Sequence, residues 1–120
     1  MAQKRALIIE DNPEIGDIYT LTLEMAGYHS EHILNGNEAL EYFDNSIPDL
    51  VVLDMNLPHV SGHYIYKKLR SRPDLNDMPI IISTANTLVA RVLEGQLGPN
   101  DRLLVKPVSP RELRAIVEKL

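Results

Sequence analysis

Short apolar runs that end in polar residues constrain the fold of this 120-residue chain more than any other feature. The central run, Leu50–Leu53, contains no polar residue and leads directly into Asp54. Ala6–Ile9, Pro79–Thr84 and Leu103–Val105 have a similar form, and they end in acids, hydroxyls and a lysine respectively. Runs without alternation are typical of strands buried on both faces of a parallel sheet. The pattern therefore predicts four buried parallel strands with polar side chains at their ends.

Helical signals separate these runs. Asn12 and Pro13 form a helix start, with Asn as the N-cap and Pro at the first helical position, and Gly27 supplies the stop. On this first helix the apolar positions, Ile18 and Met25 among them, are expected to share one core-facing side. The predicted helices cover residues 13–26, 36–47, 62–69, 88–93 and 110–120. Residues 28–34 mix polar and apolar side chains, as an edge strand does.

Strands and helices alternate five times, which predicts an α/β fold with a doubly wound parallel sheet and helices on both faces. We interpret residues 1–120 as a single domain, because the length fits one core and no linker interrupts the pattern. The absence of cysteine excludes disulfides and thiolate chemistry. The net charge of −5 argues against direct binding to nucleic acid. No signal peptide or membrane-spanning run is present, which favours a cytoplasmic protein without membrane contact.

The strand ends predict a functional site. In a parallel sheet the C-terminal ends of all strands lie at one edge, where open α/β sheets bind ligands. That edge collects Glu10, Asp11, Asp54, Thr84 and Lys106. Carboxylates about 4 Å apart repel by roughly 1 kcal/mol in water, and by several times more in a partly desolvated crevice. One lysine cannot neutralise three acids, so the set favours a hard cation, Mg²⁺ or Mn²⁺ as a substitute.

The same residues are suited to phosphoryl transfer. A carboxylate such as that of Asp54 can act as a nucleophile and hold an aspartyl-phosphate. A metal would neutralise charge on the transferring group, and Lys106 and the Thr84 hydroxyl would contact its other oxygens. Each residue alone has an ordinary structural explanation as a cap, a turn or a surface side chain. The combination of four strand ends is what makes the hypothesis specific.

With these residues in place, the chain resembles the receiver domain of two-component response regulators, of the chemotaxis-regulator type, over essentially all of its length. The resemblance is carried by the following residues: Glu10-Asp11, Asp54 with Leu57-Pro58 and Gly62, Thr84-Ala85, and Lys106-Pro107. It implies a flavodoxin-like (βα)5 fold with strand order 2-1-3-4-5. It also implies a phosphorelay function, in which a sensor histidine kinase, a phosphotransfer protein or a small acyl phosphate phosphorylates Asp54.

The resemblance further assigns roles to individual residues. Asp11, Asp54 and the backbone carbonyl of Asn56 would bind Mg²⁺, with Glu10 assisting, while Thr84 and Lys106 would contact the phosphoryl group. The Lys106-Pro107 bond is expected to be cis. The domain would not be an enzyme beyond self-catalysed phosphorylation and dephosphorylation. Its output would be binding to an unidentified protein, or formation of a homodimer through the fourth helix, fifth strand and fifth helix.

Two features depart from the family pattern. Three residues before its lysine the family usually carries an aromatic residue that reports phosphorylation, and here that position is Leu103. The residues two beyond Asp54 and Thr84, which tune the phosphoryl lifetime in this family, are Asn56 and Asn86. Neither amide can act as a general base for an attacking water, so we expect slow to intermediate self-dephosphorylation.

Several alternatives remain open at this stage. A receiver that no longer accepts phosphate and acts as a docking domain is compatible with Leu103. A phosphatase of the haloacid dehalogenase type shares the Asp, Thr, Lys and magnesium, but it usually has a second acid where this chain has Asn56. A flavin carrier would need a Ser/Thr-rich phosphate-binding loop after the first strand, and this sequence has no such loop there. The four histidines, His29, His32, His59 and His63, are expected to be surface residues rather than metal ligands.

Overall fold

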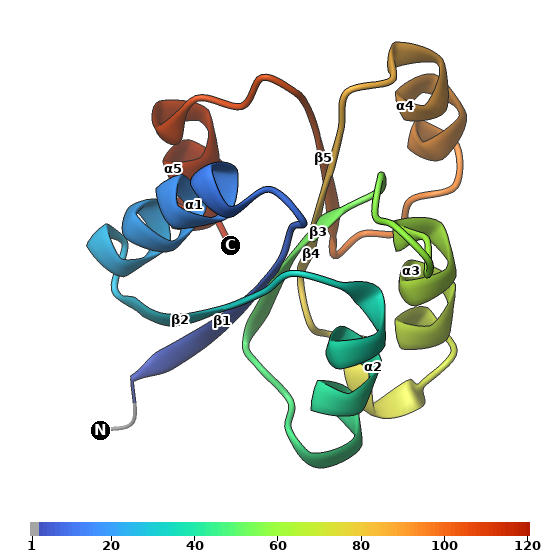
Figure 1. Ribbon diagram of the computed structural model, residues 1–120, viewed down its shortest axis with the longest axis horizontal. Helices are drawn as coiled ribbons and strands as arrows, with labels where there is room; N and C mark the ends of the chain where they lie inside the picture. Colours follow the sequence, from blue (N-terminus) through green and yellow to red (C-terminus); the bar gives the residue numbers. More distant parts are fainter. Residues whose placement is uncertain (1–2) are drawn as a thin grey trace.

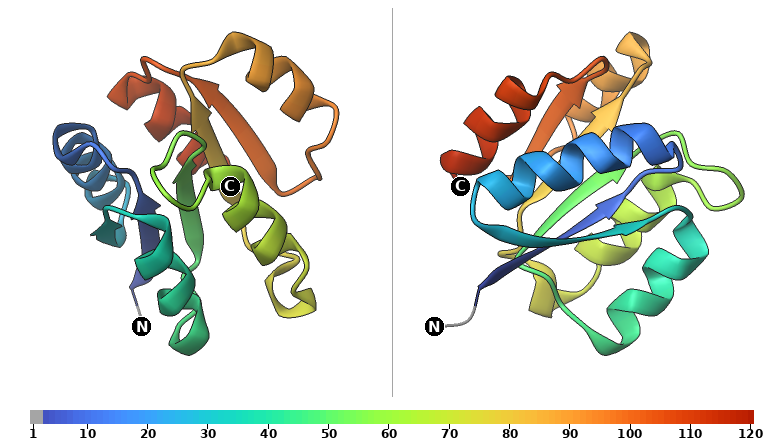
Figure 2. Two further views of the ribbon diagram at one scale, coloured as in Figure 1. Left: turned by 45° about the vertical axis from the view of Figure 1, so that its right-hand side comes forward. Right: turned by 60° about the vertical axis from the view of Figure 1, so that its left-hand side comes forward.

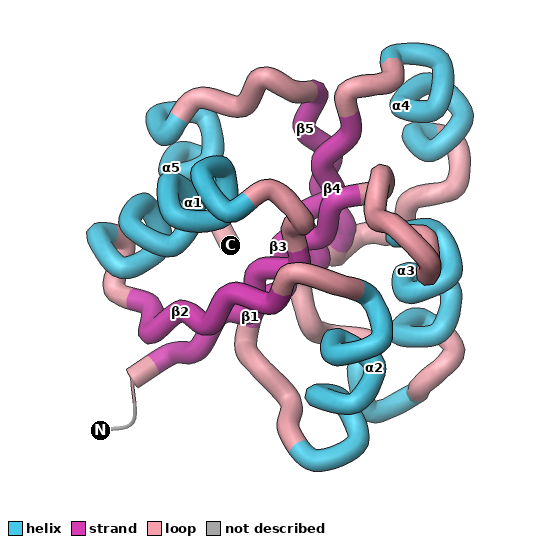
Figure 3. Tube along the Cα trace, in the orientation of Figure 1, coloured by secondary structure: helices cyan, strands magenta, loops and turns pink. Residues whose placement is uncertain are grey.

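Five parallel strands form one sheet in the order β2-β1-β3-β4-β5, and helices cover both of its faces. The computed structural model describes residues 3–120. Figures 1 and 3 show the sheet running through the middle of the molecule, with α1 and α5 on one side and α2, α3 and α4 on the other. The predicted fold class and strand order are confirmed.

The strands are β1 (Lys4–Ile9), β2 (Tyr28–Ile33), β3 (Leu50–Asp54), β4 (Ile80–Thr84) and β5 (Asp101–Val105). The helices are α1 (Pro13–Met25), α2 (Gly36–Asn45), α3 (Gly62–Arg70), α4 (Thr87–Glu94) and α5 (Pro110–Glu118), with a short 3-10 turn at Pro73–Leu75. In the part of the chain from residue 3 onward, none of the helices has the length and apolar character that crossing a bilayer requires.

Two apolar cores lie on the two faces of the sheet. Every residue of β3 and β4 is buried, which is why their sequences lack the alternation of a half-exposed strand. Successive side chains point to opposite faces, so Leu53 packs with the α2–α4 layer and Val52 packs with the α1 and α5 layer. Burial on both faces fixes the positions of the strand ends relative to one another.

Side-chain caps begin all five α-helices. The caps are Asn12, Asn35, Ser61, Asn86 and Ser109, and each accepts a hydrogen bond from a backbone N–H in the first turn of its helix. Such caps satisfy N–H groups that have no partner within the helix. Each loop that follows a strand is therefore held at its far end, close to the sheet edge that carries the predicted site.

The prediction for the core-facing side of α1 was wrong in part. Ile18 and Met25 are 47% and 61% exposed, whereas Tyr19, Thr22 and Leu23 are buried. Apolar residues occupy more than one side of this helix, so the sequence alone does not define a single buried stripe. Packing against β2 and α5 selects the side that carries Tyr19 and Leu23.

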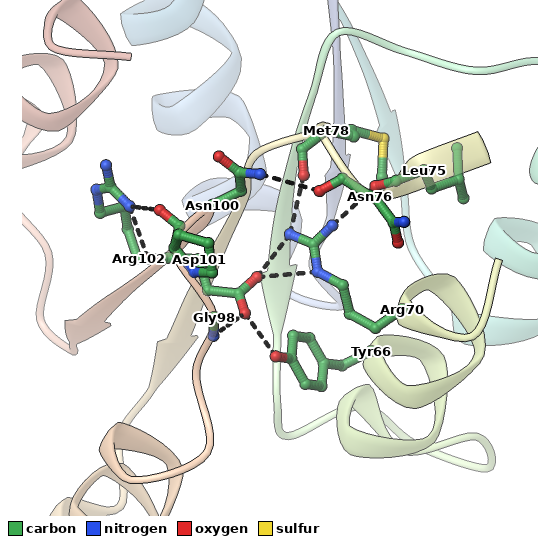
Figure 4. Close-up of polar contacts among 10 residues, drawn as sticks. Tyr66, Arg70, Leu75, Asn76, Met78, Gly98, Asn100, Asp101 and Arg102 are labelled. Atoms are coloured by element: carbon green, nitrogen blue, oxygen red, sulfur yellow. Dashed lines mark hydrogen bonds and ion pairs between the residues drawn. The ribbon is translucent and has the colours of Figure 1, made fainter. Parts of the chain in front are cut away.

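A buried polar cluster anchors the start of β5 (Figure 4). The Asp101 carboxylate accepts hydrogen bonds from the Tyr66 hydroxyl at 2.6 Å, from Nε and Nη2 of Arg70 at 3.1 and 2.6 Å, and from the Gly98 N–H at 2.8 Å. Arg70 also donates to the carbonyls of Leu75 and Met78. β5 begins at Asp101, two residues before the predicted start, because backbone pairing with Ile80 already begins there, and the cluster holds the Asp101 side chain in place.

Candidate functional site

The ends of β3, β4 and β5 lie side by side at one edge of the sheet. Asp54, the last residue of β3, is in register with Ser83, and Thr84 is in register with Val105. The Lys106 N–H donates to the Thr84 carbonyl at 2.8 Å and extends this pairing beyond β5. The structure thus places Asp54, Thr84 and Lys106 on neighbouring strand ends.

Three carboxylates converge at this edge. Glu10, Asp11 and Asp54 each offer an oxygen atom, and these oxygens all lie within 4.8 Å of one another. Glu10 and Asp54 are buried, with relative exposures of 1% and 2%, while Asp11 is exposed. The cluster therefore has two acids inside the protein and one at the solvent boundary.

Lys106 is the cation that contacts this cluster. Its Nζ donates to Oε1 of Glu10 at 2.7 Å and lies 3.4 Å from Oδ2 of Asp54. Burial disfavours the ammonium form, but the hydrogen bond with Glu10 and the charge of Asp54 outweigh this effect, so the pKa of Lys106 is raised. The lysine stays charged and is shared between two acids.

The pKa of Glu10 responds both to its burial and to the neighbouring charges. The pKa of the Glu10 carboxyl is raised from its ordinary value of 4.5 to about 7, because burial and the charge of Asp54 together outweigh the hydrogen bond from Lys106. In formal charge, one ammonium faces three carboxyl groups at this edge. A hard divalent cation with carboxylate ligands would supply the missing positive charge, and the donor set fits Mg²⁺ or Mn²⁺.

Backbone contacts in the loops after β3 and β4 position the remaining predicted site residues. The Asn56 N–H donates to Oδ1 of Asp54 at 3.1 Å, which fixes the carboxylate against the chain that follows it. Thr84 is buried, and its hydroxyl oxygen accepts from the Asn86 N–H at 3.1 Å. Gly62 lies so close to the Asp54 carbonyl that a β-carbon there would overlap that oxygen. This contact gives the glycine after Pro58 a steric role at the site.

The position of the usual aromatic residue is occupied by a leucine that packs with the core. Leu103 is half-buried, is in register with Ile82, and contacts the apolar core on the α2–α4 side. The peptide bond between Lys106 and Pro107 is cis, as predicted.

Two residues near the site were missed by the sequence analysis. His32 was expected at the surface, but it is half-buried and its Nε2 lies 2.7 Å from the Glu10 carbonyl oxygen. Tyr19 is buried, and it lines a cavity of about 460 Å³ together with Lys106 and Pro107. Burial raises the pKa of the Tyr19 phenol, and the nearby Lys106 partly offsets this. His29, His59 and His63 are exposed, as expected.

Comparisons with known proteins place the chain among similar proteins. The family model described as response regulator receiver domain matches residues 6–118. The probable transcriptional regulator ycf27 of Cyanophora paradoxa is 38% identical over 119 residues, which cover 98% of this chain and 48% of that protein. The phosphate regulon transcriptional regulatory protein PhoB of Rhizobium meliloti is 34% identical over 113 residues, covering 94% of this chain and 50% of that protein. The chain spans about half the length of the curated relatives it matches.

Solved structures agree with the sequence comparisons. The signal receiver domain of a signal transduction histidine kinase from Syntrophus aciditrophicus has a TM-score of 0.83 and 32% identity, covering 97% of this chain and 88% of that one. The chemotaxis response regulator CheY4 of Vibrio cholerae has a TM-score of 0.86 and 27% identity, with 98% of each chain covered.

Proposed function

Because this chain belongs to the response regulator receiver domain family, a family of signalling domains rather than classical enzymes, we propose that Asp54 is its phosphoryl acceptor. In this proposal phosphorylation depends on Mg²⁺, for which Mn²⁺ can substitute. The phosphoryl donor is a sensor histidine kinase, a phosphotransfer protein or a small acyl phosphate. Phosphorylation then switches the contacts that the domain makes with other proteins.

One observation carries this proposal. Asp54 is buried at the end of a fully buried strand, yet it lies 3.4 Å from the Lys106 ammonium and beside two further carboxylates. A buried acid whose only role was structural would be expected to have its charge matched by its neighbours. Here the neighbours leave negative charge in excess, as a site does when it is built to receive a cation and an anionic group.

The residues of the site would divide the chemistry between them. A carboxylate oxygen of Asp54 attacks the phosphorus, and the bond from phosphorus to the donor nitrogen or acyl oxygen breaks. The bound cation supplies charge neutralisation on the transferring group. Lys106 and the Thr84 hydroxyl contact the remaining phosphoryl oxygens. Asp11, Asp54 and the Asn56 carbonyl would hold the cation, with Glu10 assisting.

The face of α4, β5 and α5 is the proposed output surface. Leu88, Val92 and Val105 are exposed on α4 and β5, with relative exposures of 71%, 63% and 40%. The added charge of a phosphoryl group, about −1.5 to −2, would draw Thr84 and the start of α4 inward without an aromatic residue at position 103. The partner is an unidentified output protein or a second copy of the chain. Sizing with and without beryllofluoride distinguishes these two outcomes.

The net charge of −5 favours protein contacts over direct nucleic-acid contacts for this chain.

The residues two positions beyond Asp54 and Thr84 favour a phosphoryl group that persists. The Asn86 side chain accepts from the backbone N–H groups of Leu88 and Val89 and so serves as a helix cap. An amide cannot take a proton from an attacking water, and neither Asn86 nor Asn56 offers a base. A phosphoryl half-life on the order of a second would contradict this part of the proposal.

Labelling by acetyl phosphate with Mg²⁺ tests the assignment of Asp54. Wild-type protein should gain the mass of one phosphoryl group, and Asp54→Asn should not. Asp44→Asn removes an exposed carboxylate of α2 and serves as the matched control, because it should label as the wild type does. Equal labelling of Asp54→Asn would reject the acceptor assignment. Wild-type protein that does not label from acetyl phosphate or from a kinase would instead indicate a docking domain that has lost phosphorylation.

A further inference from the structure

The loop between β1 and α1 carries two of the three clustered acids, and residues of β2 hydrogen-bond to the backbone of its first residue, Glu10. The Glu10 N–H donates to the Ile33 carbonyl at 3.1 Å, continuing the ladder between β1 and β2. The Glu10 carbonyl oxygen lies 2.7 Å from Nε2 of His32. β2 ends at Ile33, where the chain turns into α2. The His32 side chain therefore takes the place of the next backbone bond in the ladder.

The first turns of α1 leave room for this histidine. Gly16 is buried, and a β-carbon at this position would overlap the imidazole ring of His32. Glycine inside a helix costs roughly 0.5–1 kcal/mol relative to alanine. At position 16 that cost is associated with a specific contact, because the ring lies directly against the helix backbone. Figure 2 shows α1 crossing over β1 and β2 on this side of the sheet.

The chemistry of the contact defines the role of the ring. A carbonyl oxygen can only accept a hydrogen bond, so Nε2 must carry a hydrogen to donate. The bond fixes the peptide that joins Glu10 to Asp11, and thereby the direction in which the Asp11 side chain leaves the loop. Asp11 itself is exposed, and its carboxylate depends on the backbone of this loop for its placement.

We infer that His32, seated against Gly16, is a positioning residue that holds the Glu10-Asp11 peptide so that both carboxylates face Asp54. The inference rests on the proposed function, because it assigns His32 to the Mg²⁺ site of that proposal. Removal of a group that orients a metal ligand without touching the metal typically weakens metal binding by about 10–100-fold. His32 touches no reacting atom, so its effect should fall on metal binding rather than on the chemical step.

Three variants separate the hydrogen bond from simple packing. His32→Leu fills the same half-buried position with an apolar side chain but removes the donor, and His32→Gln restores an N–H donor at a similar reach. His29→Leu is the matched control, because His29 is an exposed residue on the same strand. We expect His32→Leu to weaken Mg²⁺ binding about tenfold or more, as measured by calorimetry, and His32→Gln to recover most of that loss. At saturating Mg²⁺ the rate of labelling should stay near that of the wild type.

A second measurement uses the metal-free protein. In His32→Leu the Glu10 amide should exchange its hydrogen faster, because the loop loses one of its two bonds to β2, while the amides of β3 stay protected. Unchanged Mg²⁺ affinity and unchanged exchange in His32→Leu would overturn the inference, and so would an equal effect of His29→Leu. Wild-type protein that binds no Mg²⁺ would reject the proposed function, but the exchange measurement would still decide whether His32 holds the loop.

Discussion

Replacement of Asp101 by alanine is expected to destabilise the fold far more than loss of any exposed ion pair. The change removes the Asp101 carboxylate, which accepts hydrogen bonds from four donor groups. These donors are the Tyr66 hydroxyl, Nε and Nη2 of Arg70, and the Gly98 N–H. The Asp101 side chain is 1% exposed and that of Arg70 is 18% exposed. Water therefore has little access to replace the lost bonds.

The magnitude follows from the groups left without a partner. Removing one member of a buried ion pair costs about 3–5 kcal/mol, because the remaining charge stays desolvated. Arg70 keeps its bonds to the carbonyls of Leu75 and Met78, which places Asp101→Ala near the lower end, at about 3 kcal/mol. Tyr66→Phe removes a single donor to the same carboxylate and should cost about 1–2 kcal/mol.

Urea unfolding followed by circular dichroism measures these free energies. Asp74→Ala is the matched control, because it breaks the exposed pair of Arg72 and Asp74, whose side chains are 37% and 52% exposed. Solvent screens that pair, and the control should unfold close to the wild type. If Asp101→Ala unfolded at the same urea concentration as Asp74→Ala, burial of this cluster would contribute nothing to stability beyond an exposed ion pair, contrary to the prediction.

Three further predictions concern the site. The folded metal-free protein retains the Glu10 proton that the unfolded chain loses above pH 4.5. The free energy of unfolding, relative to that of Glu10→Gln, should therefore fall by on the order of 3 kcal/mol as the pH rises from 4.5 to above 7. If urea unfolding gave the same difference between the two proteins at every pH, the raised pKa of Glu10 would be contradicted. Gly62→Ala should lower stability by about 1–3 kcal/mol and slow labelling, because its β-carbon overlaps the Asp54 carbonyl, whereas Gly95→Ala, which makes only an ordinary contact, should do neither. Lys106→Met should slow acetyl phosphate labelling by roughly 10²-fold yet tighten Mg²⁺ binding in calorimetry, since the ammonium competes with the cation; weaker binding would contradict this.

The sequence predicted β1, β3 and β4 well because burial on both faces leaves a direct trace in their composition. β5 was also expected to be a buried strand, but it lies at an edge of the sheet and only Asp101 and Leu104 are buried in it. The candidate site residues follow from the same trace, since each lies at or just after the end of such a strand. Helix starts were also recognisable, because a cap and the helix it begins are neighbours in the chain. Asn86 is an exception: it caps α4, although from its place in the sequence it was expected only to affect the phosphoryl lifetime.

Contacts between distant segments left no comparable trace. His32 meets a carbonyl 22 positions earlier, and Arg70 meets an acid 31 positions later. Both contacts depend on strand register and on how closely a helix approaches the sheet, which residue spacing alone does not determine. A glycine at position 16, inside an otherwise ordinary helical pattern, was the one local sign that something lies against α1 there.

The ion pair between Glu10 and Lys106 joins residues 96 positions apart, and this separation has a consequence during synthesis on the ribosome. The three acids of the cluster emerge first, and the ammonium that offsets them arrives only with the end of β5. A nascent chain that has already paired β1 with β3 therefore brings Glu10 and Asp54 together before their lysine is available. A divalent cation bound there, as proposed above, would offset that repulsion until Lys106 joins the cluster.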